Sequence, residues 1–187
     1  MGRPSSFLDE TVFAAVANCL VEQGEVRLQA VTVTAGVSTG SIYHRFGSRE
    51  GLMAAAWLDA IEAFQERFLA ALEAGSREAG LAAALATPAF CRDEAARALI
   101  LTSGRRAEMM SDKAPPEMQA RLDQLNGKTR DGLESFALEQ RLPLERVRLA
   151  LIGIPLGAVR LYLPEKAVPE SVDAHISAAV GALLATR

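Results

Sequence analysis

The chain has 187 residues, a formal net charge of -3, and 50% hydrophobic but only 5% aromatic residues. This length allows one large domain or a small domain joined to a larger one, and a composition rich in alanine and leucine favours an all-α fold of helices packed on helices. The acidic balance argues against a protein that coats nucleic acid through bulk positive charge, but specific groove reading needs only a few well-placed Lys or Arg residues.

The sequence predicts neither a membrane span nor a secretion signal. The apolar run at residues 149–159 is too short to cross a bilayer, and no apolar run follows a basic start at the N-terminus. We therefore expect a cytoplasmic protein without a membrane partner. Cys19 and Cys91 lie far apart in sequence and lack metal-ligand spacing, which predicts buried free thiols and neither a metal site nor a disulfide framework. No cofactor is expected.

The first residues are short and polar, and Pro4 keeps Arg3 extended. An extended arm with one Arg reaches phosphates or the minor groove, whereas a loose terminus contacts nothing; both interpretations stay open. The first helix is expected over residues 9–23, because apolar residues recur there at helical spacing and Gly24 follows.

A second helix is expected over residues 28–35, and a third, short helix follows a turn. Gly36 ends the second helix, Ser38 caps the third, and Gly47 with Ser48 repeats this stop-and-cap signal. Ile42 and Phe46, four residues apart, form one apolar face for docking. The remaining side chains of the short helix are polar or small, which suits a groove better than a core.

The chain resembles the tetracycline-repressor (TetR) family of one-component transcriptional regulators in this stretch. The resemblance rests on residues that agree with the family in place and order, which are Gly36-Val37-Ser38, Gly40, Ile42-Tyr43, Phe46, Ser48-Arg49-Glu50 and Leu52. It implies a helix-turn-helix DNA-binding domain at residues 1–47 and an effector-binding and dimerisation domain at residues 48–187. The expected fold is all-α, with three N-terminal helices and about nine helices in total.

Two positions of the second helix depart from the family pattern. Arg27 stands where the family usually has a capping Thr or Ser; it cannot cap, but its guanidinium can hold a phosphate. Thr32 replaces the usual Ala, and its hydroxyl can bond back to a helix carbonyl. These departures put the cap in question rather than the domain.

The expected DNA contacts lie mostly on the third helix. Tyr43 is the main candidate for a phosphate contact and Arg49 the second, whereas His44 contacts DNA or is an ordinary surface histidine. Arg45 is less suited, because its place beside Phe46 turns it back toward the acidic residues of the first helix. The full predicted set is Arg3, Arg27, Ser38, Thr39, Gly40, Ser41, Tyr43, His44 and Arg49.

The fourth helix is expected over residues 48–74, long enough to extend from the DNA-binding domain into the body. Two helices at residues 81–86 and 89–110, parted at Thr87-Pro88, should follow. Residues 111–116 read as a loop, and residues 116–140 as another helix.

The C-terminal part predicts a dimerisation surface. Residues 144–163 carry apolar residues on two faces, with Pro155 expected to kink the helix, and a last helix is expected over residues 168–186. Two such helices pairing with those of a second copy form a four-helix bundle, as the resemblance also implies; a monomer with a buried C-terminal helix is the alternative. The expected interface residues are Leu151, Gly153, Ile154, Gly157, Leu161, Ile176 and Val180.

The sequence identifies the effector pocket less clearly than it identifies the DNA contacts. Apolar and aromatic residues suited to a hydrophobic or aromatic ligand follow the start of the fourth helix, although each also suits a plain core. Polar groups could come from Thr102, Ser103 or Asn126. The candidate set is Trp57, Phe64, Phe68, Phe90, Leu101, Met109 and Phe136.

The resemblance, together with these patterns, implies a ligand-responsive transcriptional regulator, not an enzyme. It would bind a palindromic double-stranded operator as a homodimer, act as a repressor by steric blocking, and be released by a small hydrophobic or aromatic effector. Two alternatives remain: a helical small-molecule-binding protein or enzyme with a non-functional helix-turn-helix, and a redox regulator acting through Cys91. Against an enzyme, the sequence has no triad pattern, no paired carboxylates among apolar residues and no phosphate-binding loop.

Overall fold

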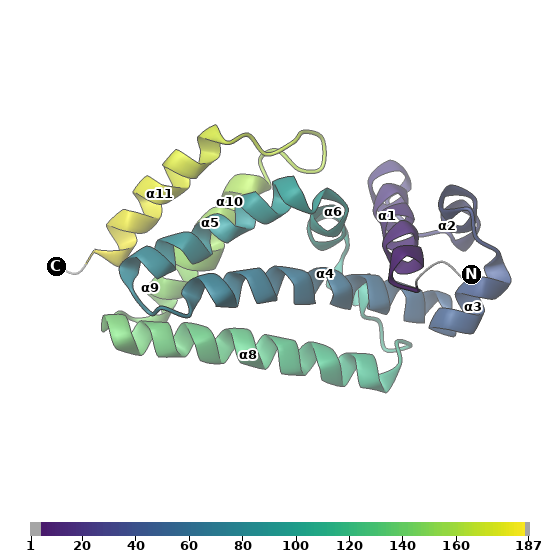
Figure 1. Cartoon of the computed structure of the whole chain (residues 1–187), viewed down its shortest axis with the longest axis horizontal. Coiled ribbons are helices and arrows are strands. Elements are labelled where there is room, and N and C mark those ends of the chain that lie inside the picture. The colour runs from purple at the N-terminus through teal and green to yellow at the C-terminus, as the bar shows by residue number, and fades with distance from the viewer. Residues whose placement is uncertain (1–4, 186–187) are drawn as a thin grey trace. The chain divides into compact units, whose positions relative to one another are not determined.

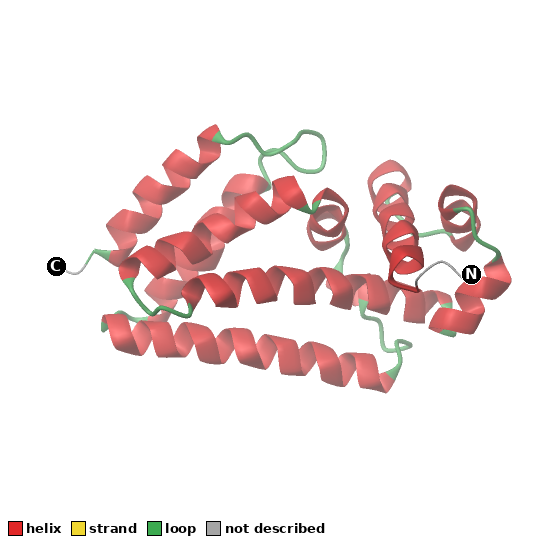
Figure 2. Cartoon of the chain, viewed as in Figure 1, coloured by secondary structure: helices red, strands yellow, loops and turns green. Residues whose placement is uncertain are grey.

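The computed structural model describes residues 5–185, and of residues 5–8 the backbone alone. Helices and loops make up all of this part of the chain, which contains no strand (Figure 2). The all-α prediction is confirmed. No helix among the described residues has the length and apolar character needed to cross a membrane.

The helices follow one another in the order labelled in Figure 1. A π-helical turn, η1, joins α9 to α10 and makes one continuous segment of the three. Their bounds are α1 Ser5–Gln23, α2 Leu28–Ala35, α3 Thr39–Phe46, α4 Arg49–Leu72, α5 Arg77–Asp93, α6 Ala95–Ser103, α7 Arg106–Met109, α8 Pro116–Gln140, α9 Leu144–Arg148, η1 Leu149–Gly153, α10 Ile154–Val159 and α11 Ser171–Leu184.

The chain divides into two compact units. The first contains residues 1–61 and 95–122, and the second contains residues 62–94 and 123–187. The two long helices, α4 and α8, contribute residues to both units. The expected domain boundary between residues 47 and 48 therefore stays a prediction.

In the first unit α1 packs against both α2 and α6. Its core includes Val16, Val31, Ile42 and Leu52, each at most 1% exposed. An ion pair between Arg97 of α6 and Asp59 of α4, 2.7 Å apart, adds a polar tie at the edge of this core. Three helices close in sequence are thus fixed on a scaffold that includes a helix from much later in the chain.

In the second unit α5 packs against α10, η1 and α11. Phe68, Phe136, Leu151, Ile176 and Val180 are at most 2% exposed and form its apolar core. Arg92 of α5 donates two hydrogen bonds to the carboxylate of Asp173 in α11, at 3.0 and 2.8 Å. Helices distant in sequence are therefore joined by both apolar burial and a bidentate ion pair.

The predicted break at Thr87-Pro88 is wrong, because α5 runs through it without interruption. A proline inside a helix removes one backbone hydrogen bond, but here Thr87 and Pro88 are both buried in a packed unit, which offsets that loss. The breaks come later, at Glu94 between α5 and α6 and at Gly104 between α6 and α7. A Cβ at Gly104 would lie 2.6 Å from the carbonyl oxygen of Ile100, so no larger residue fits there.

The segment expected as a helix to residue 163 ends at Val159, and the disturbance around Pro155 takes the form of η1. In a π turn the N–H of Ile154 reaches the carbonyl of Leu149, five residues back, instead of four. The last helix is also shorter than predicted at both ends. Proline thus changes the hydrogen-bond register of this helix without ending it.

Candidate nucleic-acid interface

The turn between α2 and α3 follows the predicted stop-and-cap pattern. Gly36 has φ 66 and ψ 32, a left-handed conformation in which its N–H reaches the last carbonyls of α2. Ser38 caps α3, because its Oγ accepts a hydrogen bond from the backbone N–H of Ser41 at 3.0 Å. Gly47 ends α3 with φ 73, a conformation that favours glycine.

One side of α3 is docked and the other is free. Ile42 is 1% exposed, and the ring of Phe46 lies 5.9 Å from that of Phe13 in α1. The opposite side is exposed over residues chosen from the sequence as DNA contacts, which are Thr39, Gly40, Ser41, Tyr43 and His44. Tyr43 is 49% exposed although its ring is large and apolar.

An ion pair ties α3 to α1. The guanidinium of Arg45 donates two hydrogen bonds to the carboxylate of Asp9, and these raise the pKa of Arg45. This contact confirms the expectation that Arg45 turns back toward the acids of the first helix. Arg45 therefore positions α3, and its guanidinium is directed at the protein.

The corner between α3 and α4 depends on Gly51, a residue that sequence reasoning missed. Ser48 caps α4 by accepting a hydrogen bond from the N–H of Gly51 at 2.9 Å. A Cβ at Gly51 would lie 2.0 Å from the carbonyl oxygen of Phe46, the last residue of α3. A glycine in the first turn of a helix, three residues after its cap, is the available sequence signal.

Two predicted phosphate ligands have protein partners. Arg27 precedes α2, makes no capping hydrogen bond as expected, and pairs with Glu25. The Nε of Arg49 donates to the carbonyl of Val26 at 2.8 Å, so this guanidinium holds the α1–α2 connection. Thr32 donates to the carbonyl of Gln29 at 2.9 Å, which confirms that its hydroxyl bonds back to the helix. Arg3 lies outside the described residues.

The candidate effector residues are divided between the two units. Trp57, Leu101 and Met109 belong to the first, and Phe64, Phe68, Phe90 and Phe136 belong to the second. Phe64 contacts both Phe68 and Phe90, with ring centroids 5.9 and 5.4 Å apart. Phe136 lines a narrow cavity of about 130 Å³ between α4 and α8. The proposed ligand set therefore stays a prediction.

Part of the predicted dimer interface needs correction. Leu151, Ile176 and Val180 are at most 1% exposed, because they pack inside their own unit, so they cannot present a surface to a second copy. Gly153 and Gly157 are exposed, and Leu161 is 81% exposed. Ile154 is half-buried. The predicted interface set therefore combines core positions with surface positions of the same helices.

Cys91 is buried, and burial raises the pKa of its thiol to about 11. A thiol with this pKa is protonated at neutral pH, whereas redox chemistry requires the thiolate. Cys19 is buried too, and burial likewise raises its pKa. These environments argue against a redox role for Cys91.

Comparison with known proteins supports the family resemblance. Residues 15–56 match the family described as "Bacterial regulatory proteins, tetR family". No curated protein sequence matches the chain.

Solved structures share its fold at low sequence identity. PfmR, a TetR family transcriptional regulator from Thermus thermophilus, aligns with a TM-score of 0.72 and 18% identity over 92% of this chain and 96% of its own. A TetR family transcription regulator from Marinobacter aquaeolei aligns with a TM-score of 0.72 and 15% identity over 96% and 95% of the two chains. A third, a TetR-family regulator from Rhodococcus sp., aligns with a TM-score of 0.67 and 16% identity over 96% and 100%.

The family match covers the C-terminal half of α1, α2, α3 and the start of α4, where capping, docking and the exposed polar face come together. Residues 15–56 are thus similar to the tetracycline-repressor family of bacterial regulatory proteins, and the chain as a whole has the fold of solved structures titled as TetR family regulators.

Proposed function

We propose that the chain is a ligand-responsive transcriptional repressor that binds a palindromic operator as a homodimer. The observation that carries this proposal is the arrangement of α3. The helix is capped by Ser38, anchored by Ile42 and tied to α1 by Arg45, while its polar face stays exposed. A short helix that is fixed by these three contacts and has one free polar face suits insertion into a major groove.

The DNA contacts that we propose use this free face. Tyr43 and the hydroxyls of Thr39 and Ser41 can donate to phosphates or base edges, and Gly40 allows close backbone approach. His44 is the remaining base-contact candidate on α3. Since Arg27 and Arg49 already have protein partners, we expect them to contribute less to the affinity than their charge suggests.

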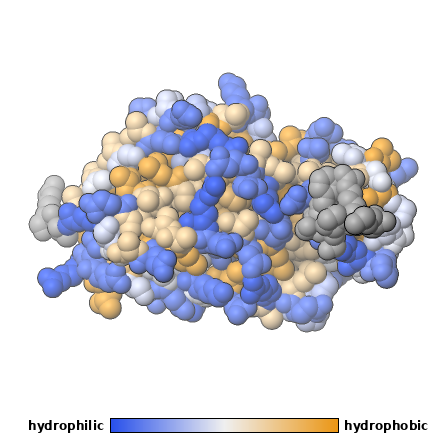
Figure 3. Space-filling view, viewed as in Figure 1, coloured by the Kyte–Doolittle hydropathy of each residue, from blue (hydrophilic) through white to orange (hydrophobic). Residues whose placement is uncertain are grey.

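Dimerisation would use the exposed small and apolar residues of η1, α10 and α11. Gly153 and Gly157 lie exposed one turn apart, followed by the exposed Leu161. Exposed alanines 174, 178, 182 and 185 lie on α11 and just after it. In Figure 3 apolar residues gather over α5 and α11 on the face shown. Small residues of this kind allow helices of two copies to approach closely, and a two-fold dimer presents two reading helices.

The effector would bind among the apolar and aromatic residues of the candidate set, which are Trp57, Phe64, Phe68, Phe90, Leu101, Met109 and Phe136. A structure titled as the multidrug binding protein EbrR complexed with imidazole aligns over 99% of this chain at 16% identity and a TM-score of 0.57. That similarity shows the fold alone. Because α4 supplies residues to both units, it gives a covalent route by which ligand binding could change the spacing of the reading helices.

Selection of random double-stranded DNA by the purified full-length chain tests this proposal. We expect an enriched palindrome whose half-sites are about one helical turn apart, bound by two chains per duplex in native mass spectrometry. Recovery of unselected DNA alone, with a retained small molecule, would instead favour the helical binding protein with a non-functional helix-turn-helix. A repressor should also block transcription from a promoter containing the selected site.

A further inference from the structure

The helix-turn-helix region, residues 9–56, carries little free positive charge. It contains no lysine and more carboxylates than arginines. The carboxylates are Asp9, Glu10, Glu22, Glu25 and Glu50, and the arginines are Arg27, Arg45 and Arg49. Affinity for DNA depends largely on cations that neutralise phosphates. Few positions of this region can therefore supply the charge that a duplex requires.

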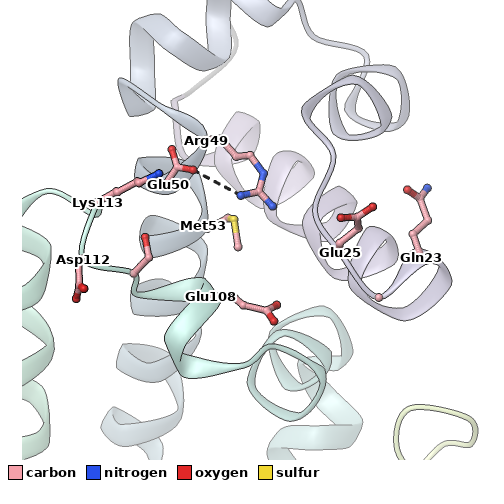
Figure 4. A pocket seen from close by; sticks show the side chains of 10 residues that line it. Gln23, Glu25, Arg49, Glu50, Met53, Glu108, Asp112 and Lys113 are labelled. Carbon is pink, nitrogen blue, oxygen red and sulfur yellow. Dashed lines mark ion pairs between the residues drawn. The ribbon is translucent and has the colours of Figure 1, made fainter.

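Each arginine of this region is paired with a carboxylate of the same region. The pairs are Arg27 with Glu25, Arg45 with Asp9, and Arg49 with Glu50. Figure 4 shows the last pair, in which Arg49 lies 3.6 Å from Glu50. Since each pair is formally neutral, these arginines add little net charge to the surface that would meet a duplex.

His44 lies at the centre of the exposed face of α3. A helix turns about 100° per residue, so His44, two residues from both Ile42 and Phe46, lies roughly 160° around the axis from each of these docked side chains. It is exposed, and Gly40, one turn before it, has no side chain that would cover the imidazole. Because helical side chains lean toward the N-terminus, the ring leans toward this open position. His44 thus lies most directly opposite the docked face.

His44 forms no ion pair with a carboxylate of the residues that the structure describes. The titratable groups of the surrounding elements are Asp9, Glu10, Cys19 and Glu22 on α1, Glu25 and Arg27 before α2, Tyr43 and Arg45 on α3, and Arg49 and Glu50 at the start of α4, whereas α2 itself has none. Histidine is the side-chain type whose charge ordinarily changes between about pH 5 and pH 8. Protonation of His44 therefore adds a positive charge that no neighbouring pair already cancels.

We propose that protonated His44 supplies the free positive charge of this face, so that operator binding takes up protons; this inference rests on the proposed function. Neutral imidazole has one N–H donor and no charge, whereas the protonated ring has two donors and a charge to place against phosphate. Only the protonated form gains this contact. The gain is thus complete at acid pH, where the free ring is already protonated, and is lost as the pH rises.

Fluorescence anisotropy with the duplex selected by the native chain tests this inference at about pH 6 and about pH 8, each over a series of salt concentrations. The test variants are H44Q, which does not titrate, and H44K, which is charged at both pH values. The matched control is H175Q, because His175 on α11 is the other histidine of the chain and is also exposed. Circular dichroism verifies folding at both pH values, and sedimentation verifies the number of chains per duplex.

We expect the native chain and H175Q to bind roughly tenfold more tightly at the lower pH, because hydrogen bonds to charged groups are the stronger ones. Their salt dependence should also become steeper there, by about one counterion per chain. H44Q should lose both responses. H44K should show the steeper salt dependence at both pH values.

The possible failures are distinguishable. Binding of the native chain that changes with neither pH nor protonation-linked salt dependence would overturn this inference and leave operator binding intact. A native pH response in H44Q, or H44K binding as weakly and with as little salt dependence as H44Q, would also overturn it. Absence of any selected duplex at both pH values would overturn the proposed function and this inference together.

Discussion

The α2–α3 region of the first unit and the α10–α11 region of the second are organised by different means. The first is fixed by directional contacts: the Ser38 cap, left-handed Gly36, and the ion pair of Arg45 with Asp9. The second has a buried apolar side and an exposed side of small residues and a single large leucine. Directional contacts set the orientation of a reading helix, whereas a small-residue surface is suited to be covered by a second copy.

Substitution of Leu161 should have the largest effect, and it should weaken the dimer without unfolding the chain. Its replacement in L161E places a charge on the proposed interface, and burying an unpaired charge costs roughly 3 kcal/mol or more. We expect sedimentation to show a shift from dimer to monomer. The control is L138E on α8, because Leu138 is 80% exposed and Leu161 is 81% exposed. An unchanged dimer in L161E would place the interface elsewhere.

Substitution of Gly51 should have the next largest effect, because Gly51 lies where the connection from α3 to α4 sets the position of α3. In G51A the new Cβ would meet the carbonyl of Phe46, and we expect the free energy of unfolding to fall by about 2 kcal/mol, with loss of operator binding. Denaturant titration measures the first and a mobility-shift assay the second. G127A in α8 is the control, since nothing lies within 4 Å of its Cβ and alanine favours helix. Full stability in G51A would mean that the corner relaxes easily.

The Arg45–Asp9 pair should contribute less to the free energy of unfolding, about 1 kcal/mol, because both side chains are partly exposed. Single variants D9N and R45Q and their combination form a double-mutant cycle, in which the pair appears as non-additivity. Operator affinity should fall in both single variants, because α3 loses its tie to α1. If R45Q alone weakened operator binding, Arg45 would be a direct DNA contact instead.

Substitution of Cys91 should have the smallest effect, which is on the pH dependence of the stability of the second unit. Its folded pKa of about 11 exceeds the ordinary value of 9.0, so the neutral thiol stabilises the folded chain below pH 9, and this contribution is lost as the pH rises toward 11. Between pH 8 and 9.5 the native chain should lose roughly 0.8 kcal/mol more than C91A does. Denaturant titration at both pH values measures this. Parallel pH dependence in the two proteins would contradict the assigned burial.

The sequence predicts the first region better than the second for a physical reason. Caps and left-handed turns are local, so Gly36, Ser38 and Gly47 identify α3 from a few neighbouring residues. The clash that makes Gly51 necessary is also local, yet it appears only when the α3–α4 corner is built. In the second unit a periodic pattern reveals two apolar faces but not which one is buried, so Leu151 and Leu161 looked alike.

The same limit explains Pro88 and the effector set. A proline predicts a break from local chemistry, but burial of α5 overrides it. Trp57 and Phe64 lie two turns apart on α4 and yet belong to different units, which spacing alone does not reveal. Arg49 looked like a phosphate ligand, and its bond to Val26 depends on contacts between α1, α2 and α4.

The central claim, that the exposed face of α3 reads DNA, is tested most directly at Tyr43. Fluorescence anisotropy would compare the selected duplex bound by the native chain, Y43F and Y43A, with circular dichroism as the control for folding. If the hydroxyl contacts phosphate, both variants should bind roughly tenfold more weakly while remaining folded. Unchanged affinity in a folded Y43A protein would contradict the assignment of this face to DNA.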